Sequence, residues 1–517
     1  MTKINGVLAT VAGLAVSELA AGLTGTRVTP TLAVGQLVIE YTPGSVAERA
    51  ISAVGQWDKP LLVAGVLVVT LVIGAFLGSQ AERRPAVATG GFAVLALIGA
   101  VAVLSRPDGR ALSVVAAVAG AGTAALALRL LQKQRRSSEP PVAVATGAGR
   151  PAVDRRTVLR NVVVVLAGSA VVAGAGRWIG YARTAVEQTR AGLRLPVRQI
   201  ATPDGTDPAV KGITAWKTPT ADFYRIDTAL SPPLIKPEDW SLRIHGMVEQ
   251  ELTLTYQDLV DRGLVDAWVT LCCVSNPVGG DLIGNTSFSG VPTKQILADV
   301  GVLPEADALL STSEDGWTCG TPLEALTDGR NSLLAVAMDG EPLTVDHGFP
   351  VRQVVPGLYG YVSATKWVVD WEVTRFGAFS AYWTRRGWSD KGPVKTHSRI
   401  DTPGGDVDAG PVKVAGVAWA QHRGIEAVEV RVDGGAWQPA TLSTVDGGSV
   451  STNGDADPES TRIDTWVQWV WDWEATGGDH TLEVRATDST GEPQTSEVAD
   501  VLPDGATGYH SVRLSVG

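Results

Sequence analysis

The chain has 517 residues, with 43 lysines and arginines against 54 aspartates and glutamates, and a formal net charge of −11. This length is sufficient for three or four domains, and the acidic balance gives no support to a nucleic-acid partner. Three cysteines in a chain of this length are too few for a disulfide scaffold.

Five apolar stretches near the N-terminus are each long enough to span a bilayer, which needs about 20 residues. They cover residues 4–23, 61–79, 86–105, 111–131 and 158–179. Their many small residues allow close contacts between helices. Residues 1–180 are therefore expected to form a transmembrane helical anchor of about five spans. The mixed segment 31–57 is interpreted as an outer loop near the membrane surface.

The basic residues between these stretches predict the orientation of the anchor. Arg83 and Arg84 lie between the second and third stretches. Six basic residues lie between the fourth and fifth, and a seventh, Arg160, lies at the start of the fifth. The positive-inside rule places both connections in the cytoplasm. The N-terminus is then also inside, and all residues after 179 lie outside the cytoplasm. The pair Arg155-Arg156 resembles a twin-arginine export signal, with ordinary cytoplasmic charge as the alternative.

The membrane part lacks the usual ligands of haem iron. No histidine occurs before His245, and Met1 is the one methionine before Met247. Haem needs axial ligands that are usually His or Met, so no haem is expected there. Glu18 lies inside the first stretch, where a carboxylate is either functional or close enough to one interface to stay hydrated.

A mixed α+β domain is expected over residues 209–398, after a polar linker at 181–208. Its main signal is the stretch Thr270–Asn276, which follows the strand-like run Ala267–Val269 and holds Cys272 and Cys273. The turn residues Pro277, Gly279 and Gly280 that follow favour an exposed thiol, and a thiolate is a soft metal ligand. The alternative is a small buried hydrophobe.

A second cluster of polar residues lies between His347 and Trp367. It contains His347, Arg352 and Lys366, each beside a turn rich in glycine or proline. Such turns let the backbone approach a ligand closely, and these three side chains donate hydrogen bonds to phosphate-like groups. The cluster predicts an anionic ligand.

Together, these two clusters and the segment 283–292 resemble the sulfite oxidase family of molybdenum–molybdopterin enzymes. The resemblance covers residues 210–517 and implies a single bound molybdopterin, with Cys273 as the metal ligand. It also implies cofactor-binding and substrate-orienting residues. Cofactor binding is expected of Tyr224, Arg225, Cys273, Asp315, His347, Arg352, Ser363, Thr365 and Lys366. Catalytic roles are expected of Cys273, Arg225, Arg385 and Arg386.

The chain departs from the family pattern at positions that bear on the substrate. Pro277 and Val278 stand where sulfite oxidases have a pair of arginines, and Val336 stands where they have a tyrosine. A pocket without these groups is expected to bind a small dianion less well, because each charge-assisted contact contributes about 1.5–3 kcal/mol. Sulfite itself is therefore doubtful as the substrate.

Residues 399–517 are expected to form an all-β, immunoglobulin-like sandwich. Short alternating runs at 412–419, 425–432, 466–473 and 480–488 are separated by turn residues, including Asp433-Gly434-Gly435. The tryptophans of 466–473 are expected to lie mostly in the core. This domain resembles the dimerisation domain of sulfite oxidases, which implies a homodimer.

Three functions are compatible with the sequence. The leading interpretation is a membrane-anchored molybdopterin oxidoreductase outside the cytoplasm, transferring oxygen to or from a small sulfur or other oxo compound. It would exchange electrons with a separate carrier or a quinone. The second is an S-oxide reductase of the same family, for example one acting on methionine sulfoxide. The third is a cofactor-free scaffold that kept the fold for binding.

Overall fold

The computed structural model describes residues 2–24, 28–54, 57–106, 111–137, 183–443 and 458–517. The chain divides into two compact units, Met1–Gln188 with Thr228–Leu234, and Thr189–Asp227 with Ile235–Gly517. The predicted fifth span, residues 158–179, and the pair Arg155-Arg156 lie outside the described residues.

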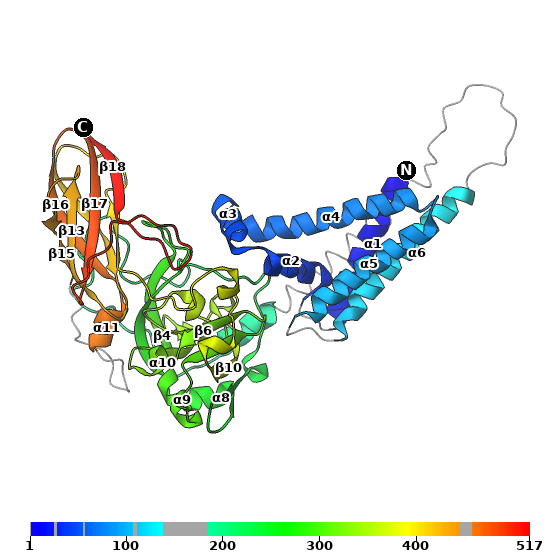
Figure 1. Cartoon of the computed structure of the whole chain (residues 1–517), viewed down its shortest axis with the longest axis horizontal. Helices are drawn as coiled ribbons and strands as arrows, with labels where there is room; N and C mark the ends of the chain where they lie inside the picture. The colour runs from blue at the N-terminus through cyan, green and yellow to red at the C-terminus, as the bar shows by residue number, and fades with distance from the viewer. Residues whose placement is uncertain (1, 25–27, 55–56, 107–110, 138–182, 444–457) are drawn as a thin grey trace. The chain divides into compact units, whose positions relative to one another are not determined.

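Helices form the first unit (Figure 1). They are α1 (Thr2–Leu23), α2 (Pro30–Tyr41), α3 (Gly44–Val54), α4 (Asp58–Gln80), α5 (Pro85–Leu104) and α6 (Ser113–Ser137). Four of them, α1, α4, α5 and α6 as far as Lys133, are long and apolar enough to cross a membrane. These four correspond to the first four predicted spans.

The expected outer loop at 31–57 is wrong in its secondary structure, because α2 and α3 occupy most of it. The Thr29 side chain accepts a hydrogen bond from the backbone of Leu32, and Pro30 occupies the first helical turn. Both features favour a helix start. With 12 and 11 residues, these helices are shorter than the length needed to span a bilayer.

Small residues allow helix α1 to approach α4 and α6 closely. A Cβ atom added to Gly6 would lie 2.1 Å from the carbonyl oxygen of Gly74, and one added to Gly13 would lie 2.6 Å from that of Gly120. Small residues at helix contacts are typical of membrane proteins, where burial from water does not drive association. The close contacts therefore fit the expected anchor.

Two sheets form the first part of the second unit. One has the order β2-β1-β10-β5-β6, and the other has the order β3-β4-β7-β8, with β9 also paired to β7. Their strands are β1 (Ser241–Gly246), β2 (Leu252–Thr255), β3 (Val265–Cys272), β4 (Ile283–Pro292), β5 (Ala308–Ser313), β6 (Thr318–Pro322), β7 (Leu333–Met338), β8 (Glu341–Pro342), β9 (Arg352–Val354) and β10 (Val368–Thr374).

Short helices connect these strands. They are α8 (Tyr256–Asp261), α9 (Thr293–Val300), α10 (Glu324–Thr327), η2 (Pro237–Asp239), η3 (Val345–His347), η4 (Gly360–Val362), η5 (Phe376–Ala378) and η6 (Thr384–Arg386). Helix α8 starts with a capping box between Thr255 and Asp258, which satisfies two backbone donors that would otherwise lack partners. In the predicted linker, residues 183–192 are helical.

Two four-stranded sheets form the C-terminal part. Their orders are β11-β12-β16-β15 and β14-β13-β17-β18. The elements are β11 (His397–Thr402), β12 (Gly410–Trp419), β13 (Ile425–Val432), β14 (Gln438–Pro439), β15 (Thr441–Leu442), α11 (Pro458–Asp464), β16 (Val467–Ala475), β17 (Gly478–Asp488) and β18 (His510–Val516). One hydrophobic core joins Val414, Trp469 and Trp471 with Val428 and Val484 of the other sheet. The immunoglobulin-like topology stays a prediction.

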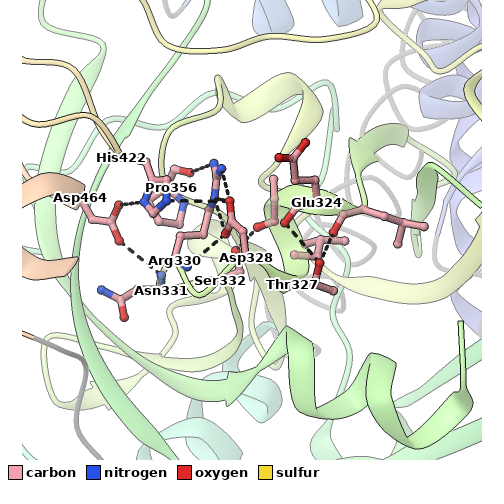
Figure 2. Close-up of polar contacts among 12 residues, drawn as sticks. Glu324, Thr327, Asp328, Arg330, Asn331, Ser332, Pro356, His422 and Asp464 are labelled. Atoms are coloured by element: carbon pink, nitrogen blue, oxygen red, sulfur yellow. Dashed lines mark hydrogen bonds and ion pairs between the residues drawn. The ribbon is translucent and has the colours of Figure 1, made fainter. Parts of the chain in front are cut away.

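Buried hydrogen bonds join the C-terminal sheets to the sheets before them. The indole nitrogen of Trp216 donates to the carbonyl oxygen of Trp466 at 3.1 Å, and the indole of Trp466 donates to that of Trp216 at 2.8 Å. A second contact centres on His422 and Asp464, which face the segment that includes Asp328 (Figure 2). The two parts of the second unit are therefore held by specific polar contacts as well as apolar packing.

Candidate functional site

Strand β3 places Cys273 at the start of a tight turn. Its last residue, Cys272, pairs with Ile283 of β4. The Cys273 amide donates to the carbonyl oxygen of Leu282 at 2.9 Å, and the Asn276 amide donates to the carbonyl oxygen of Cys273 at 3.1 Å. The Asn276 side chain accepts a hydrogen bond from the Leu282 amide at 2.9 Å. The turn is therefore fixed at both ends.

The structure does not bear out the expected exposure of the thiol. Cys273 is 9% exposed and Cys272 is 2% exposed. The turn folds back on β4, and the segment around Gly360 covers it: a Cβ atom on Gly360 would lie 3.8 Å from the carbonyl oxygen of Cys272 and 4.0 Å from the hydroxyl of Tyr224. The Cys272 thiol contacts the carbonyl oxygen of Cys273 at 3.4 Å, and Asn276 donates to its sulfur at 3.9 Å.

Gly348 lets the two basic side chains of the later cluster come together. Arg352 and Lys366 face each other in an isolated antiparallel bridge. Gly348 has a φ of +105°, and a Cβ atom there would lie 3.0 Å from the Cβ of Arg352 and 3.1 Å from that of Lys366. A side chain at this position would be strained and crowded. The glycine-rich turn that the sequence shows thus has a steric purpose.

Arg352 is a buried cation with few protein partners. It is 4% exposed, and its NH1 donates to the carbonyl oxygen of His347 at 3.4 Å. Its buried Nε atom has no hydrogen-bond partner among the described residues. Burial lowers the pKa of Arg352 to about 10. A buried charge without a counter-ion is costly, so this guanidinium fits an anionic ligand.

Lys366 and Arg225 share the carboxylate of Asp227. The Lys366 ammonium lies 3.1 Å from Asp227 Oδ2, and the Arg225 Nε lies 3.0 Å from the same oxygen. Lys366 also donates to the carbonyl oxygen of Asp346 at 3.0 Å, while Arg225 NH1 lies 3.0 Å from the Asp346 carboxylate. Burial lowers the pKa of Lys366 to about 8, although the charge of Asp227 opposes this shift.

His347 is held as a neutral imidazole. Burial, together with the charges of Lys366 and Arg352, lowers its pKa to about 3. The ring of Phe223 meets it edge to face at 5.8 Å between centroids. The buried Nδ1 atom of His347 has no hydrogen-bond partner among the described residues. A neutral ring of this kind can accept or donate one hydrogen bond to a ligand.

Tyr224 connects the cysteine turn to the basic cluster. Burial is the main reason why its pKa is raised well above the ordinary value, and the charges of Cys273 and Cys272 add to that rise. The nearby charge of Arg352 acts in the opposite direction. The phenol is therefore close enough to interact electrostatically with both cysteines and with Arg352. The structure brings together six of the predicted residues: Cys273, Tyr224, Arg225, His347, Arg352 and Lys366.

Two predicted cofactor residues, Ser363 and Thr365, make their hydrogen bonds within the protein. Ser363 donates to the carbonyl oxygens of Leu358 and Tyr359 at 3.2 and 3.0 Å. The Thr365 hydroxyl lies 3.1 Å from the sulfur of Cys319. These contacts stabilise the loop before Lys366, and the predicted roles of Ser363 and Thr365 in cofactor binding stay predictions.

The other predicted site residues lie in local structures of their own. Asp315 accepts a hydrogen bond from the Trp317 amide in the turn between β5 and β6. The Arg386 guanidinium lies 3.7 Å above the ring of Tyr382 and donates to the carbonyl oxygen of Tyr382. Arg385 is exposed. Their predicted roles in binding and catalysis stay predictions.

Two carboxylates of the site were not assigned a role from the sequence. Asp227 and Asp346 neutralise Lys366 and Arg225. Asp346 directly precedes His347, so its position offered a signal. Asp227 is 139 residues from Lys366, and nothing in the sequence pairs them.

Comparisons with known proteins define the class. Residues 229–383 match the family described as the oxidoreductase molybdopterin binding domain. The chain is 33% identical over 181 residues to an uncharacterised oxidoreductase, YuiH, of Bacillus subtilis, covering 35% of this chain and 88% of that protein. The chain therefore belongs to the family of oxidoreductases with a molybdopterin-binding domain.

Other relatives match over shorter shares of their length. The mitochondrial sulfite oxidase of Drosophila melanogaster is 30% identical, covering 29% of this chain and 30% of that protein. The NADH nitrate reductase of Spinacia oleracea is 29% identical, covering 25% of this chain and 17% of that protein. A solved structure, the sulfane dehydrogenase SoxCD of Paracoccus pantotrophus, aligns with a TM-score of 0.48 at 23% identity, covering 58% of this chain and 82% of that one.

Proposed function

We propose that this chain is a membrane-anchored molybdenum–molybdopterin oxidoreductase whose catalytic part faces outside the cytoplasm. Its reaction would transfer an oxygen atom to or from a small sulfur or other oxo compound. The observation that carries the proposal is the buried guanidinium of Arg352, whose Nε has no protein partner among the described residues. An anionic pterin phosphate would supply the missing counter-charge.

The residues present fit the cofactor in three respects. Cys273 offers a thiolate, a ligand suited to a soft or high-valent metal. Arg352 and His347 each have a buried nitrogen atom without a hydrogen-bond partner in the part of the chain that the structure describes. Gly348 and Gly360 lack a side chain where the site is crowded. A Cβ atom on Gly348 would contact Arg352 and Lys366, and one on Gly360 would contact Tyr224. Tyr224 lies close to both Cys273 and Arg352, so the sulfur and the basic cluster belong to one part of the fold.

Each side chain has a distinct proposed role. Cys273 would hold the metal, and Arg352 with His347 would bind the organic part. Lys366, kept in place by Asp227, would contribute a second positive charge to the same anion. Arg225 would lie toward the substrate, because it is more exposed than Lys366. When bound, the cofactor supplies the two-electron and oxygen-transfer chemistry.

The described helices support the membrane location. If α4 and α5 both span the bilayer, the short connection with Arg83 and Arg84 lies in the cytoplasm by the positive-inside rule. The C-terminal end of α6, with Arg129 and Lys133, then also lies inside. A fifth span at 158–179 would bring the catalytic part outside. Protease accessibility in sealed vesicles of known orientation tests this topology.

A reductase acting on a neutral S-oxide is a second candidate. The positions of Pro277, Val278 and Val336 carry no charge or hydroxyl, and Val336 is completely buried in β7. A pocket without these donors favours a neutral oxide over a small dianion. Electrons would then pass from a separate carrier or a quinone to the site. Assays with sulfite in one direction and a sulfoxide in the other distinguish the two reactions.

Metal analysis tests the proposal most directly. The full chain, purified from cells able to make molybdopterin, is expected to contain about one molybdenum atom per site, with a pterin released on denaturation. A molybdenum-to-protein ratio near zero in such cells would contradict the enzyme assignment and favour a cofactor-free scaffold.

A further inference from the structure

The segment between β3 and β4 carries Cys273 but has few side chains of its own to hold it. It contains Pro277, Gly279 and Gly280, and Gly279 has a φ of +76°. Within the segment, the Gly280 amide donates to the carbonyl oxygen of Pro277 at 2.9 Å. The Asn276 side chain bonds to the Leu282 amide. A glycine-rich segment gains more conformational freedom than others when its external contacts are lost.

Arg399 of strand β11 contacts this segment from the C-terminal sheets. Its NH1 donates to the carbonyl oxygen of Gly280 at 2.6 Å, and its NH2 donates to the Thr214 hydroxyl at 2.8 Å. Its Nε lies 2.6 Å from Asp401 Oδ1. The other carboxylate oxygen of Asp401 accepts a hydrogen bond from the Thr214 amide at 2.9 Å. The guanidinium is thus fixed on three sides.

A second residue of the same sheets supports this contact. His510 of β18 packs directly on Gly279, where an added Cβ atom would lie 2.2 Å from the imidazole Cδ2. The His510 ring is itself held, because its Nδ1 accepts a hydrogen bond from the Ile400 amide at 3.0 Å. Ile400 follows Arg399 in β11, so both contacts come from one rigid part of the fold.

We propose that Arg399 is a positioning residue that holds the cysteine turn in the geometry needed for metal ligation. The contact path runs from Arg399 to Gly280, through the turn to Leu282, and from the Leu282 carbonyl to the Cys273 amide. The bond from a charged guanidinium to a carbonyl oxygen is stronger than a neutral one, and the planar fork reaches three acceptors at once. The role in ligation rests on the proposed function, since it presumes that Cys273 binds the metal.

The chain offers a matched control in Arg423. Its Nε donates to Asp488 at 2.9 Å, and its NH2 donates to the carbonyl oxygen of Val394 and the hydroxyl of Thr396, both at 3.0 Å. Arg423 therefore also pairs with a buried aspartate and bonds to two further oxygens, although its side chain is 29% exposed against 10% for Arg399. None of these contacts involves the cysteine turn. The variants to compare are R399M, R399K, D401N and R423M.

Hydrogen exchange in the cofactor-free full chain measures the positioning itself. R399M is expected to raise the exchange rates of the Gly280 and Leu282 amides by about tenfold or more, the effect of losing a hydrogen bond to a charged group. R423M is expected to leave these amides unchanged. R399K and D401N are expected to give smaller increases in these exchange rates, because each keeps part of the contact. These two variants can still test the role of Arg399 if R399M does not fold.

Spectroscopy of the loaded chain measures the consequence at the metal. R399M is expected to shift the g-values of the Mo(V) electron paramagnetic resonance signal, and R423M to leave them unchanged. Exchange rates unaltered by R399M, or raised equally by R423M, would overturn the role of Arg399. Molybdenum absent from the wild-type chain would instead overturn the proposed function, with the exchange result still deciding whether Arg399 holds the turn.

Discussion

The guanidinium of Arg352 donates a hydrogen bond to the backbone carbonyl of His347, which is also buried, at 3.4 Å. No carboxylate contact is found for Arg352 among the described residues, whereas the nearby Lys366 and Arg225 share that of Asp227. Lys366 and Arg225 are thus paired with a carboxylate of the protein. Arg352 has no such counter-charge in the described part of the chain, so it is proposed to depend most on an anionic ligand.

Replacing Arg352 by Met is expected to affect the empty and loaded proteins in opposite directions. Without the cofactor, removing a buried charge that lacks a counter-ion should be neutral or stabilise the fold by about 1–4 kcal/mol. With the cofactor, the loss of a charge-assisted contact should weaken retention at least about tenfold. Thermal unfolding and molybdenum content after dialysis measure the two effects.

A surface arginine provides the control for this experiment. Arg243 pairs with Glu251 at 3.0 Å, and both side chains are more than half exposed. R243M should change neither quantity, because exposed ion pairs contribute little. If R352M strongly destabilised the cofactor-free chain, Arg352 would have protein partners that the structure does not show, and its role as an anion ligand would be lost.

The stability of the cofactor-free chain should fall as the pH drops below about 6.5. His347 has a folded-state pKa of about 3 against an ordinary value of 6.5. Between these values the unfolded chain binds a proton that the folded chain excludes, so the free energy of unfolding decreases with decreasing pH. The expected loss is on the order of 3–5 kcal/mol by pH 3, at about 1.4 kcal/mol per pKa unit.

The variant H347Q should remove part of this acid sensitivity. His397, whose pKa is lowered by burial to about 4, contributes in the same direction and remains. His480 shows the opposite sign, because its contact with Asp433 raises its pKa and strengthens as the pH falls. A melting temperature with the same pH slope in H347Q and the wild type would show that the imidazole of His347 is not buried as a neutral group.

The sequence predicted the parts of the site that depend on local pattern. An apolar run followed by turn residues predicted the cysteines just past a strand end, and β3 ends at Cys272. The glycine-rich turns beside Arg352 and Lys366 were also predicted from the sequence. Helices α2 and α3 were missed because their polar residues weakened the apolar signal, while the start of α2 depends on the cap at Thr29. Local sequence patterns were therefore sufficient to predict strand ends and turns, but they were less reliable for short helices.

Contacts between distant residues were not predictable in the same way. Asp227 meets Lys366 across 139 residues, and Arg399 meets Gly280 across 119. The segments around Asp227 and Arg399 contain no periodicity or motif that indicates these long-range contacts. Thr365 was predicted from its place beside Lys366, and its contact with the Cys319 sulfur could not be predicted from its own segment. The direction in which a side chain points depends on packing between distant segments, and local sequence patterns do not reveal that packing.

The two adjacent cysteines should differ sharply when each is replaced by serine. C273S is expected to lose molybdenum and to lower turnover by about 100-fold or more. Replacing a residue that merely hydrogen-bonds a metal ligand already lowers metal affinity or activity by about 10–100-fold, so loss of the ligand itself should cost at least as much. C272S should keep both, because the Cys272 sulfur bonds within the turn to Asn276 and to the backbone of Cys273. Thermal unfolding checks that both variants fold. Molybdenum retained in C273S and lost in C272S would reverse the assignment of the ligand.

The contact between His422 and Asp464 should contribute strongly to the stability of the second unit. The Asp464 side chain is completely buried, and its carboxylate lies 3.0 Å from Nδ1 of His422 (Figure 2). Burial raises the pKa of Asp464, while His422 acts in the opposite direction. The ring of His422 also lies 3.8 Å from the carboxylate of Asp328, which holds Arg330. Removing the imidazole would leave the buried carboxyl group with a weaker hydrogen bond from the Asn331 amide, at 3.3 Å, and the nearby charge of Arg330.

The variant H422N tests this contact without straining the backbone. His422 has a φ of +64°, a conformation that Asn tolerates better than most residues. We expect a loss of about 2–4 kcal/mol in the free energy of unfolding, the range for a buried charged group that loses its partner. H480N is the matched control: it removes a similar pair with Asp433 at 2.7 Å, where the aspartate is half exposed, and should cost much less than H422N because exposed ion pairs contribute little. Equal losses in the two variants would mean that burial of Asp464 does not set the strength of the contact between the two parts of this unit.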